Sequence, residues 1–280
     1  MNLTNPNAQL FIPGGTNEKT ALERITHLCI AAHQDDVEIM AYGPIAECYN
    51  SESKWFGAVV VTDGSGSLRD GSPPGGKANA EIKAIRAVEQ NKAALIGRYS
   101  AMLQLGYESK AVKKPNASCT AEMAAIVCAC RPQFLFTHNL FDKHDTHVAI
   151  AMRLLEALQL VPENLRPEKV YALEVWRGLD WLNDEAKVIF DTAPYPELAL
   201  ELLSVFASQI KGGKRYDLAA MGRRVGNATF LAPDSVDEKS SLTYGMDMTA
   251  LVRNPDLNGF INAHLDEFRR DVLNRIMRTS

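Results

Sequence analysis

The sequence lacks the features that mark membrane, secreted and nucleic-acid-binding proteins. No apolar run approaches the 18 residues that suggest a membrane-spanning helix. The N-terminal segment MNLTNPNAQLFIPGG has neither the basic stretch nor the apolar stretch of a secretory signal, so we expect a cytoplasmic protein. The 30 basic residues do not outnumber the 34 acidic ones, and the net charge of −4 argues against a nucleic-acid partner.

Cysteine is scarce and its number is odd. The chain has five, most of them in apolar stretches: Cys29, Cys48, Cys119, Cys128 and Cys130. They fit reduced thiols better than a disulfide framework, and the CxC spacing of the last pair favours core residues over a redox motif. A hydrophobic content of 46% and a charged content of 23% are ordinary for a globular enzyme and exclude disorder as the main state.

Short apolar runs alternate with segments of helical periodicity. Strands are expected at residues 25–32, 55–62, 100–105, 133–137, 169–176 and 187–190. Helices are expected at residues 37–49, 78–97, 120–130 (capped by Thr120), 146–160, 197–210 and 257–277. The alternation predicts an α/β fold, a Rossmann-like three-layer αβα sandwich with a mostly parallel sheet.

The whole chain, residues 1–280, is expected to form a single domain. Its motifs lie in a core at residues 25–160, and the part at 161–280 is less recognisable. Residues 63–76 are expected to form a polar loop rich in Gly, Ser and Pro. Residues 211–244 are rich in Gly, Arg and Ser and show weak periodicity, so irregular structure is expected there.

Three polar segments follow predicted strands: residues 33–36, 62–66 and 138–147. Since ligands bind beyond the carboxyl ends of parallel strands, we expect these segments to meet at one edge of the sheet. His33, Asp36 and His147 are the expected metal ligands. Two imidazoles and one carboxylate with an open position are the ligand count of a catalytic zinc, although iron or cobalt would suit the same ligands.

The neighbouring polar residues suggest catalytic roles. Adjacent side chains at a turn diverge, so Asp35 is the better candidate for a general base, acting on water whose pKa zinc lowers to about 7. His144 could stabilise an oxyanion if protonated, or protonate a leaving amine. A less specific interpretation is that Asp35 or Asp36 only caps the following helix. Trp176, Arg177 and Trp181 follow a predicted strand and could stack on a sugar ring, although core packing is the commoner use of tryptophan.

Four segments carry a family resemblance. Residues 32–38 (AHQDDVE) resemble an AHPDDE motif, with glutamine in place of proline and one residue inserted before the glutamate. Residues 142–147 (DKHDTH) keep the histidine spacing of a second motif, and residues 61–66 (VTDGSG) and 86–89 (RAVE) match two more. In this order, over residues 25–160, they resemble the PIG-L/LmbE-like family of zinc-dependent de-N-acetylases.

The resemblance implies one Zn²⁺ per chain, with the ligands already named, Asp35 as the base and His144 assisting at the tetrahedral intermediate. It also implies that Arg86 contacts the substrate. Asp142 stands where some family members have a carbonyl-polarising tyrosine, so it is assigned to substrate binding, and it could instead orient a histidine. The family's substrates are mostly N-acetylglucosaminyl compounds.

We therefore expect a zinc-dependent hydrolase that removes acetyl from a small N-acetylated amino sugar. Two alternatives stay open. A sugar-binding or regulatory protein with a degenerate metal site is suggested by the departures from the motifs at Gln34, at Asp142 and at Thr146, which stands where the second motif has an aspartate. The other alternative is a zinc hydrolase of another amide or ester. The amphipathic segment at residues 257–277 could pack on the domain or join copies of the chain in a homo-oligomer.

Overall fold

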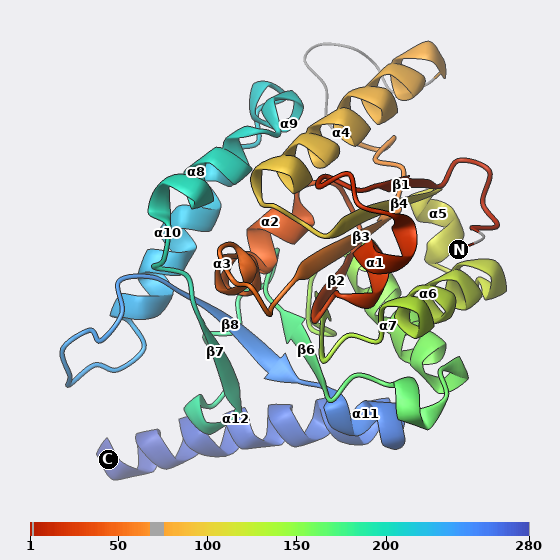
Figure 1. Ribbon diagram of the computed structural model, residues 1–280. Coiled ribbons are helices and arrows are strands. Elements are labelled where there is room, and N and C mark those ends of the chain that lie inside the picture. Colours follow the sequence, from red (N-terminus) through yellow and green to blue (C-terminus); the bar gives the residue numbers. More distant parts are fainter. Residues whose placement is uncertain (2, 68–75, 280) are drawn as a thin grey trace.

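The computed structural model describes residues 1, 3–67 and 76–279. Within these residues, one sheet of eight strands has the order β1-β4-β3-β2-β5-β6-β8-β7 (Figure 1). The strands are β1 (Gln9–Phe11), β2 (His27–Ala31), β3 (Phe56–Thr62), β4 (Ala101–Tyr107), β5 (Phe134–His138), β6 (Lys169–Leu173), β7 (Lys187–Asp191) and β8 (Leu242–Asp247). Strands β4, β3, β2, β5 and β6 run parallel, whereas β1 and β8 are antiparallel to their neighbours, which confirms the mostly parallel sheet.

Twelve α-helices lie in the described part of the chain. They are α1 (Glu18–Glu23), α2 (Asp36–Met40), α3 (Tyr42–Cys48), α4 (Gly76–Ile96), α5 (Ser109–Val112), α6 (Ala117–Cys130), α7 (Asp145–Leu160), α8 (Pro196–Ser204), α9 (Ala207–Lys211), α10 (Tyr216–Thr229), α11 (Thr249–Arg253) and α12 (Leu257–Thr279). Short 3-10 turns occur at Glu163–Leu165 and Asp184–Ala186. None of these helices is both long enough and apolar enough to cross a membrane.

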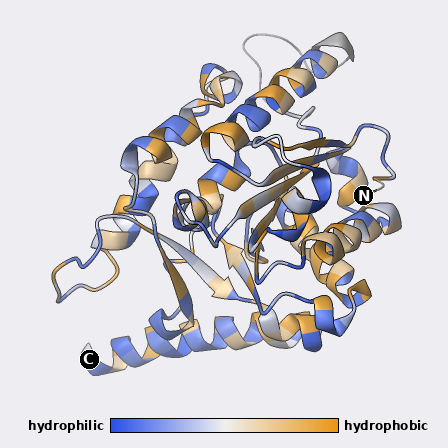
Figure 2. Cartoon of the chain, in the orientation of Figure 1, coloured by the Kyte–Doolittle hydropathy of each residue, from blue (hydrophilic) through white to orange (hydrophobic). Residues whose placement is uncertain are grey.

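Alternate side chains of the central strands enter two separate cores. In β2, Leu28 and Ile30 pack in one core, and Cys29 and Ala31 pack in the other. Helices α1, α6, α7 and α11 close the first core, and α2, α3, α4 and α8 close the second. The sheet therefore lies between two helical layers, and its central strands are mostly hydrophobic (Figure 2). This confirms the Rossmann-like three-layer αβα sandwich.

Three helix predictions were wrong in their boundaries. The helix expected at 197–210 is two helices, α8 and α9, separated at residues 205 and 206. The helix expected at 37–49 is two helices, α2 and α3, separated at Ala41. Pro44 explains the break, because a proline cannot donate to the carbonyl four residues earlier and its ring clashes with that carbonyl. The helix expected from Thr120 begins earlier, at Ala117, because the Asn116 side chain caps it and accepts from the Cys119 N–H at 3.0 Å.

The prediction of irregular structure over residues 211–244 was also wrong, because that stretch contains helix α10 and the start of strand β8. An arginine occupies a buried position of α10, where a hydrophobic pattern requires an apolar residue. Arg224 is 2% exposed and donates to the backbone carbonyls of Glu38 at 2.7 Å and Ile39 at 3.2 Å. Leu218 and Val225 of the same helix are 59% and 49% exposed, so the apolar residues of α10 do not mark its buried face.

The C-terminal part of the chain contributes to the same sheet, because β6, β7 and β8 continue it beyond β5. The first half of α12 packs on the domain through aromatic contacts, including that of Phe268 with Trp181 at 5.8 Å between ring centroids. Leu265 and Ile276 on the same helix are exposed, and a role of α12 in joining copies of the chain stays a prediction. Residues 68–75 of the expected polar loop lie outside the described residues.

Candidate metal centre

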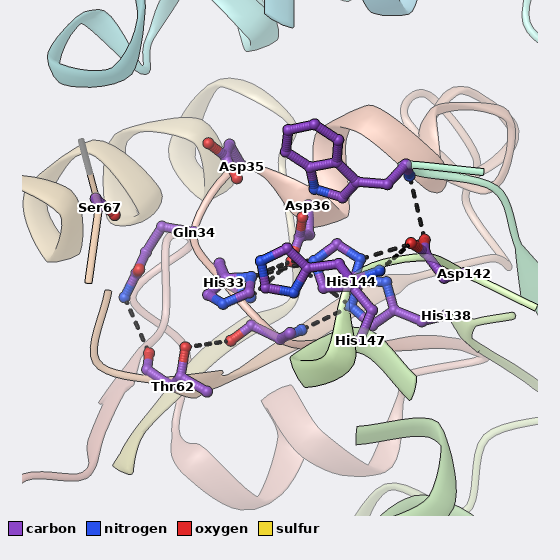
Figure 3. A network of polar contacts seen from close by, with 12 residues as sticks. His33, Gln34, Asp35, Asp36, Thr62, Ser67, His138, Asp142, His144 and His147 are labelled. Carbon is purple, nitrogen blue, oxygen red and sulfur yellow. Dashed lines mark hydrogen bonds and ion pairs between the residues drawn. The ribbon is translucent and has the colours of Figure 1, made fainter. Parts of the chain in front are cut away.

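The turn between β2 and α2 sets the first side chains of the centre. Asp35 adopts a φ of 87° and ψ of −31°, a left-handed conformation that costs roughly 1–3 kcal/mol in a residue other than glycine. It occupies the N-cap position of α2, but its side chain makes no capping hydrogen bond. The turn directs the carboxylates of Asp35 and Asp36 apart, as Figure 3 shows. Asp36 Oδ2 accepts from the His33 backbone N–H at 2.7 Å.

His33, Asp36 and His147 come together at the carboxyl edge of the sheet, although they lie up to 114 residues apart in sequence. His33 Nδ1 lies 3.0 Å from Asp36 Oδ2 and 3.2 Å from His147 Nε2. His147 Nε2 lies 3.2 Å from the same carboxylate oxygen. A tetrahedral zinc with bonds of about 2.0–2.1 Å requires its ligand atoms roughly 3.3 Å apart. The three atoms therefore have the spacing and chemistry of a zinc site.

His147 is held from behind by Asp142. Asp142 Oδ2 lies 3.3 Å from His147 Nδ1 and accepts the Trp176 backbone N–H at 3.1 Å, while Oδ1 accepts the His144 backbone N–H at 3.0 Å. The carboxylate is fully buried, so both of its oxygens are used inside the protein. Metal-binding histidines usually donate their second nitrogen to such a carboxylate. The position fits the orienting alternative for Asp142, on the side of His147 opposite His33 (Figure 3).

A fourth histidine, His138 at the end of β5, was not assigned a role from the sequence. Two overlapping groups have ligand atoms close enough for a metal, His33 with His144 and His147, and Asp36 with His138 and His147. However, His138 Nε2 already accepts the Ala32 backbone N–H at 2.8 Å, so its lone pair is occupied. We therefore count His138 as the residue that ties β5 to the end of β2. Its position as the last residue of a strand was the available signal.

Charge and burial act differently on the ligands. The pKa of Asp36 is lowered because His147 and His33 together outweigh the cost of burying the carboxylate. Burial disfavours the charged form of His147, but Asp36 and Asp142 outweigh it and raise its pKa to about 9. Burial lowers the pKa of His33. Without a metal, His147 is therefore protonated at pH 7 and pairs with the ionised Asp36. A metal ion that binds His147 Nε2 must displace that proton.

Asp35 lies beside the ligands and is held by Arg86. The Arg86 guanidinium donates to Asp35 Oδ2 at 3.2 Å and also contacts the Gln34 carbonyl and the Ser67 hydroxyl. Burial raises the pKa of Asp35 to about 8, against the opposing charge of Arg86. A divalent cation at the neighbouring site would lower this pKa by its own charge. Gln34, which replaces a proline of the motif, donates to the Thr62 carbonyl at 3.3 Å (Figure 3).

His144 stands at the front of the centre. Its ring lies 4.5 Å from that of His147 and 5.0 Å from that of His33, measured between centroids, and its buried Nδ1 has no hydrogen-bond partner among the described residues. Burial lowers its pKa to about 4, with a contribution from the neighbouring histidines. His144 is therefore a neutral imidazole at pH 7, which can donate one N–H but holds no positive charge.

A cavity of about 450 Å³ opens onto His33, Asp35, Arg86 and His144. Its far wall comes from the C-terminal part of the chain, through Trp176, Lys214 and Tyr216, among others. Lys214 Nζ lies 5.2 Å from the Trp176 ring centroid. Strand β6 ends at Leu173, before the predicted end at residue 176, and this frees Trp176 to line the cavity. The sequence indicated Trp176, but no local pattern indicated Lys214 or Tyr216.

Residues 28–158 match the model of the PIG-L family, described as GlcNAc-PI de-N-acetylase. A comparison with curated proteins finds no match.

Several solved structures share the fold. N,N'-diacetylchitobiose deacetylase from Pyrococcus horikoshii is 16% identical, with a TM-score of 0.65 over 88% of this chain and 92% of that one. GalB, the 4-carboxy-2-hydroxymuconate hydratase of Pseudomonas putida KT2440, is 19% identical, with a TM-score of 0.62 over 80% and 96%. The A40926 pseudoaglycone deacetylase Dbv21 is 15% identical, with a TM-score of 0.55 over 80% and 97%. At these identities the similarity establishes the fold alone, and the deacetylase and hydratase activities belong to those proteins.

Proposed function

We propose, from the premise that residues 28–158 form a PIG-L family domain, that this protein is a zinc-dependent hydrolase of N-acetylated amino sugars. It removes the acetyl group and releases acetate and a free amine. The observation that carries the proposal is the triangle of ligand atoms of His33, Asp36 and His147, with sides of 3.0–3.2 Å. It lies next to a buried carboxylate, Asp35, and at the wall of a cavity large enough for a sugar.

Zinc would be held by His33, Asp36 and His147, with one ion per chain. When bound, it supplies Lewis-acid chemistry, polarising an acyl carbonyl and lowering the pKa of water towards about 7. Asp142 fixes the ring of His147 so that Nε2 faces the site. We assign Asp142 to this positioning role.

Asp35 is the general base. It takes a proton from the water whose oxygen adds to the acetyl carbon, and a proton then passes to the nitrogen as the C–N bond breaks. Arg86 keeps the Asp35 carboxylate oriented through the 3.2 Å contact, and it also lines the cavity in which the substrate binds. The positive φ of Asp35 directs its carboxylate away from that of Asp36, so Asp35 can act as the base while Asp36 binds the metal.

His144 stabilises the developing negative charge on the acyl oxygen. Because the imidazole is neutral, it acts as an N–H donor, not as a cation. The sugar occupies the large cavity, where the exposed part of Trp176 offers an aromatic surface.

The first experiment measures metal content and acetate release together. Wild-type protein is expected to bind close to one zinc per chain and to release acetate from N-acetylglucosamine or its conjugates. His147→Ala is expected to lose both properties. His264→Ala is the matched control, because His264 lies on α12 and contacts Phe260 and Phe141 instead of the ligands.

The outcomes separate the alternatives. If the protein binds zinc and cleaves another amide or an ester but releases no acetate from any N-acetyl sugar, the proposed substrate is wrong and the proposed mechanism stands. Sugar binding without hydrolysis at any metal loading would support a binding protein with a degenerate site. A wild-type protein that binds no metal after incubation with zinc would contradict the proposal.

A further inference from the structure

A second cavity adjoins the metal centre. It has a volume of about 260 Å³ and lies beside the larger one, since Asp35, Trp176 and Tyr216 line both. The rings of Trp176 and Tyr216 meet edge to face, with centroids 6.1 Å apart and planes at 87°. These two rings therefore form a shared wall between the two cavities.

The ligand triangle lies at the junction of the two cavities. His33 lines the larger cavity and Asp36 lines the smaller one, while their ligand atoms are only 3.0 Å apart. An amide bound there would extend its amine part into one cavity and its acyl part into the other.

The two cavities differ in chemistry. Polar side chains contribute much of the larger lining, including Ser67, Thr146 and Gln209, which suits a sugar bearing hydroxyl groups. Away from the ligands, the smaller cavity is lined by Ile39, Val175, Ala219 and Ala220, together with the two aromatic rings. Such walls offer few hydrogen bonds to a polyol, and they favour alkyl groups.

Two cationic side chains, Lys143 and Arg223, also line the smaller cavity, but neither offers it a free set of hydrogen-bond donors for a sugar. Arg223 donates to the Val175 carbonyl, which occupies part of its guanidinium, and Lys143 is solvent-exposed. Both side chains contribute methylene stems as well as charge.

The size of the smaller cavity exceeds what acetyl needs. A methyl or methylene group takes roughly 30 Å³, the share of one water molecule in the liquid. The acetyl methyl would leave most of the 260 Å³ unfilled, whereas a linear chain of up to about eight carbons would fit.

We propose that the cavity lined by Ile39, Val175 and Ala220 is an acyl pocket, and that the enzyme prefers N-acyl amino sugars with linear chains of four to eight carbons over N-acetyl sugars. This rests on the proposed amide hydrolysis. In this reaction the oxygen of water bonds to the acyl carbon and the C–N bond breaks. A linear carboxylate and the free amine are released.

The first test compares N-acetyl-, N-butyryl-, N-hexanoyl- and N-octanoylglucosamine with the zinc-loaded enzyme. Each added methylene that enters the pocket is expected to raise kcat/KM about fourfold until the pocket is full. Ala220→Leu, which extends a buried side chain into the pocket, is expected to lower the ratio of hexanoyl to acetyl kcat/KM at least tenfold. Ala219→Leu serves if Ala220→Leu does not fold, because Ala219 lies at the exposed side of the lining.

Val225→Leu is the matched control. Val225 is 49% exposed, lies on the same helix α10 and does not line the pocket, so the ratio is expected to stay that of the wild type. A second readout avoids turnover altogether: calorimetric binding of N-hexanoyl- and N-acetylglucosamine to Asp35→Asn. The hexanoyl compound is expected to bind at least tenfold more tightly.

The results distinguish the two proposals. Acetate release with no gain in kcat/KM for longer chains overturns the acyl pocket and leaves the proposed function standing. If no N-acyl sugar is hydrolysed, the proposed function is wrong. The binding experiment then tests by itself whether the smaller cavity binds acyl chains. Equal affinities for the two compounds, or a hexanoyl preference that both pocket variants retain, overturn the acyl pocket.

Discussion

Replacing Asp142 by asparagine tests how the metal centre is held together. The carboxylate is surrounded by donors: backbone N–H groups of His144 on Oδ1 and of Trp176 on Oδ2, at 3.0 and 3.1 Å, and His147 Nδ1 at 3.3 Å from Oδ2. When His147 binds a metal through Nε2, its Nδ1 carries a proton and is also a donor. Every polar neighbour of the carboxylate then needs an acceptor.

An asparagine cannot meet this need in either orientation. Its NH₂ group faces the His144 N–H in one orientation, and the Trp176 N–H with His147 Nδ1 in the other. One buried backbone N–H loses its acceptor, which should cost roughly 1–3 kcal/mol of folding free energy. The lost negative charge makes His147 a poorer ligand, so zinc affinity should fall about 10–100-fold. That range corresponds to about 1.4–2.8 kcal/mol of binding free energy.

Zinc affinity is measured by competition with a chromophoric chelator, and stability by thermal unfolding of the chelator-treated protein. Asp145→Asn is the control, because the Asp145 side chain is 87% exposed and its nearest cation, Lys113, lies 4.0 Å away. We expect this control to keep wild-type zinc affinity. Wild-type affinity in Asp142→Asn as well would refute the reasoning that the buried carboxylate tunes His147.

The remaining predictions concern the reacting groups, the bound metal and a surface ion pair. Asp35→Asn should retain zinc, measured by elemental analysis, and lose about 10²–10⁴-fold in kcat, since a positioned base contributes that much; turnover near the wild-type rate would remove Asp35 from the role of base. His144→Ala should also retain zinc with reduced turnover, and loss of the metal would instead make His144 a fourth ligand. Stripping the metal should lower the melting temperature, since an ion that binds only the folded state stabilises it; an unchanged melting temperature would argue against a bound ion. His27, whose Nε2 lies 3.6 Å from the Glu47 carboxylate, and Lys54 together lower the pKa of Glu47 to about 2, against the cost of burial. Its stabilisation should therefore be present above pH about 4.5 and fade as the pH falls towards 2. Glu47→Gln should be less stable than wild type by at most about 1 kcal/mol at pH 7 in urea unfolding, because Glu47 is 44% exposed, and the difference should shrink at pH 3.

The sequence determined the layers of the fold because the direction of each strand side chain is a local property. Alternation in β2 sends Leu28 and Ile30 to one core and Cys29 and Ala31 to the other, and both sets are apolar. The same local logic placed polar residues at the strand ends, and parallel pairing of β2 with β3 and β5 brings those ends to one edge. The approach of His33, Asp36 and His147 follows from this.

Local patterns did not predict the elements whose buried faces are polar. Helix α10 escaped prediction because Arg224 on its buried face donates to the carbonyls of Glu38 and Ile39, which lie 186 and 185 positions away. His138 escaped assignment for a similar reason, since its acceptor role depends on the Ala32 N–H of a neighbouring strand. In both cases the partner that makes burial favourable is distant in sequence.

Tertiary structure alone decided the shape of the site. The wall formed by Trp176 and Tyr216, and the two cavities that it separates, come from a segment after β6 and a helix that packs back over α2. The carboxylate of Asp142 can orient His147 only because the fold brings the His147 ring and the Trp176 backbone N–H to it. Periodicity in a sequence records which way each residue faces. A cavity depends on which surfaces meet and what space they leave, and long-range packing of the whole chain sets both.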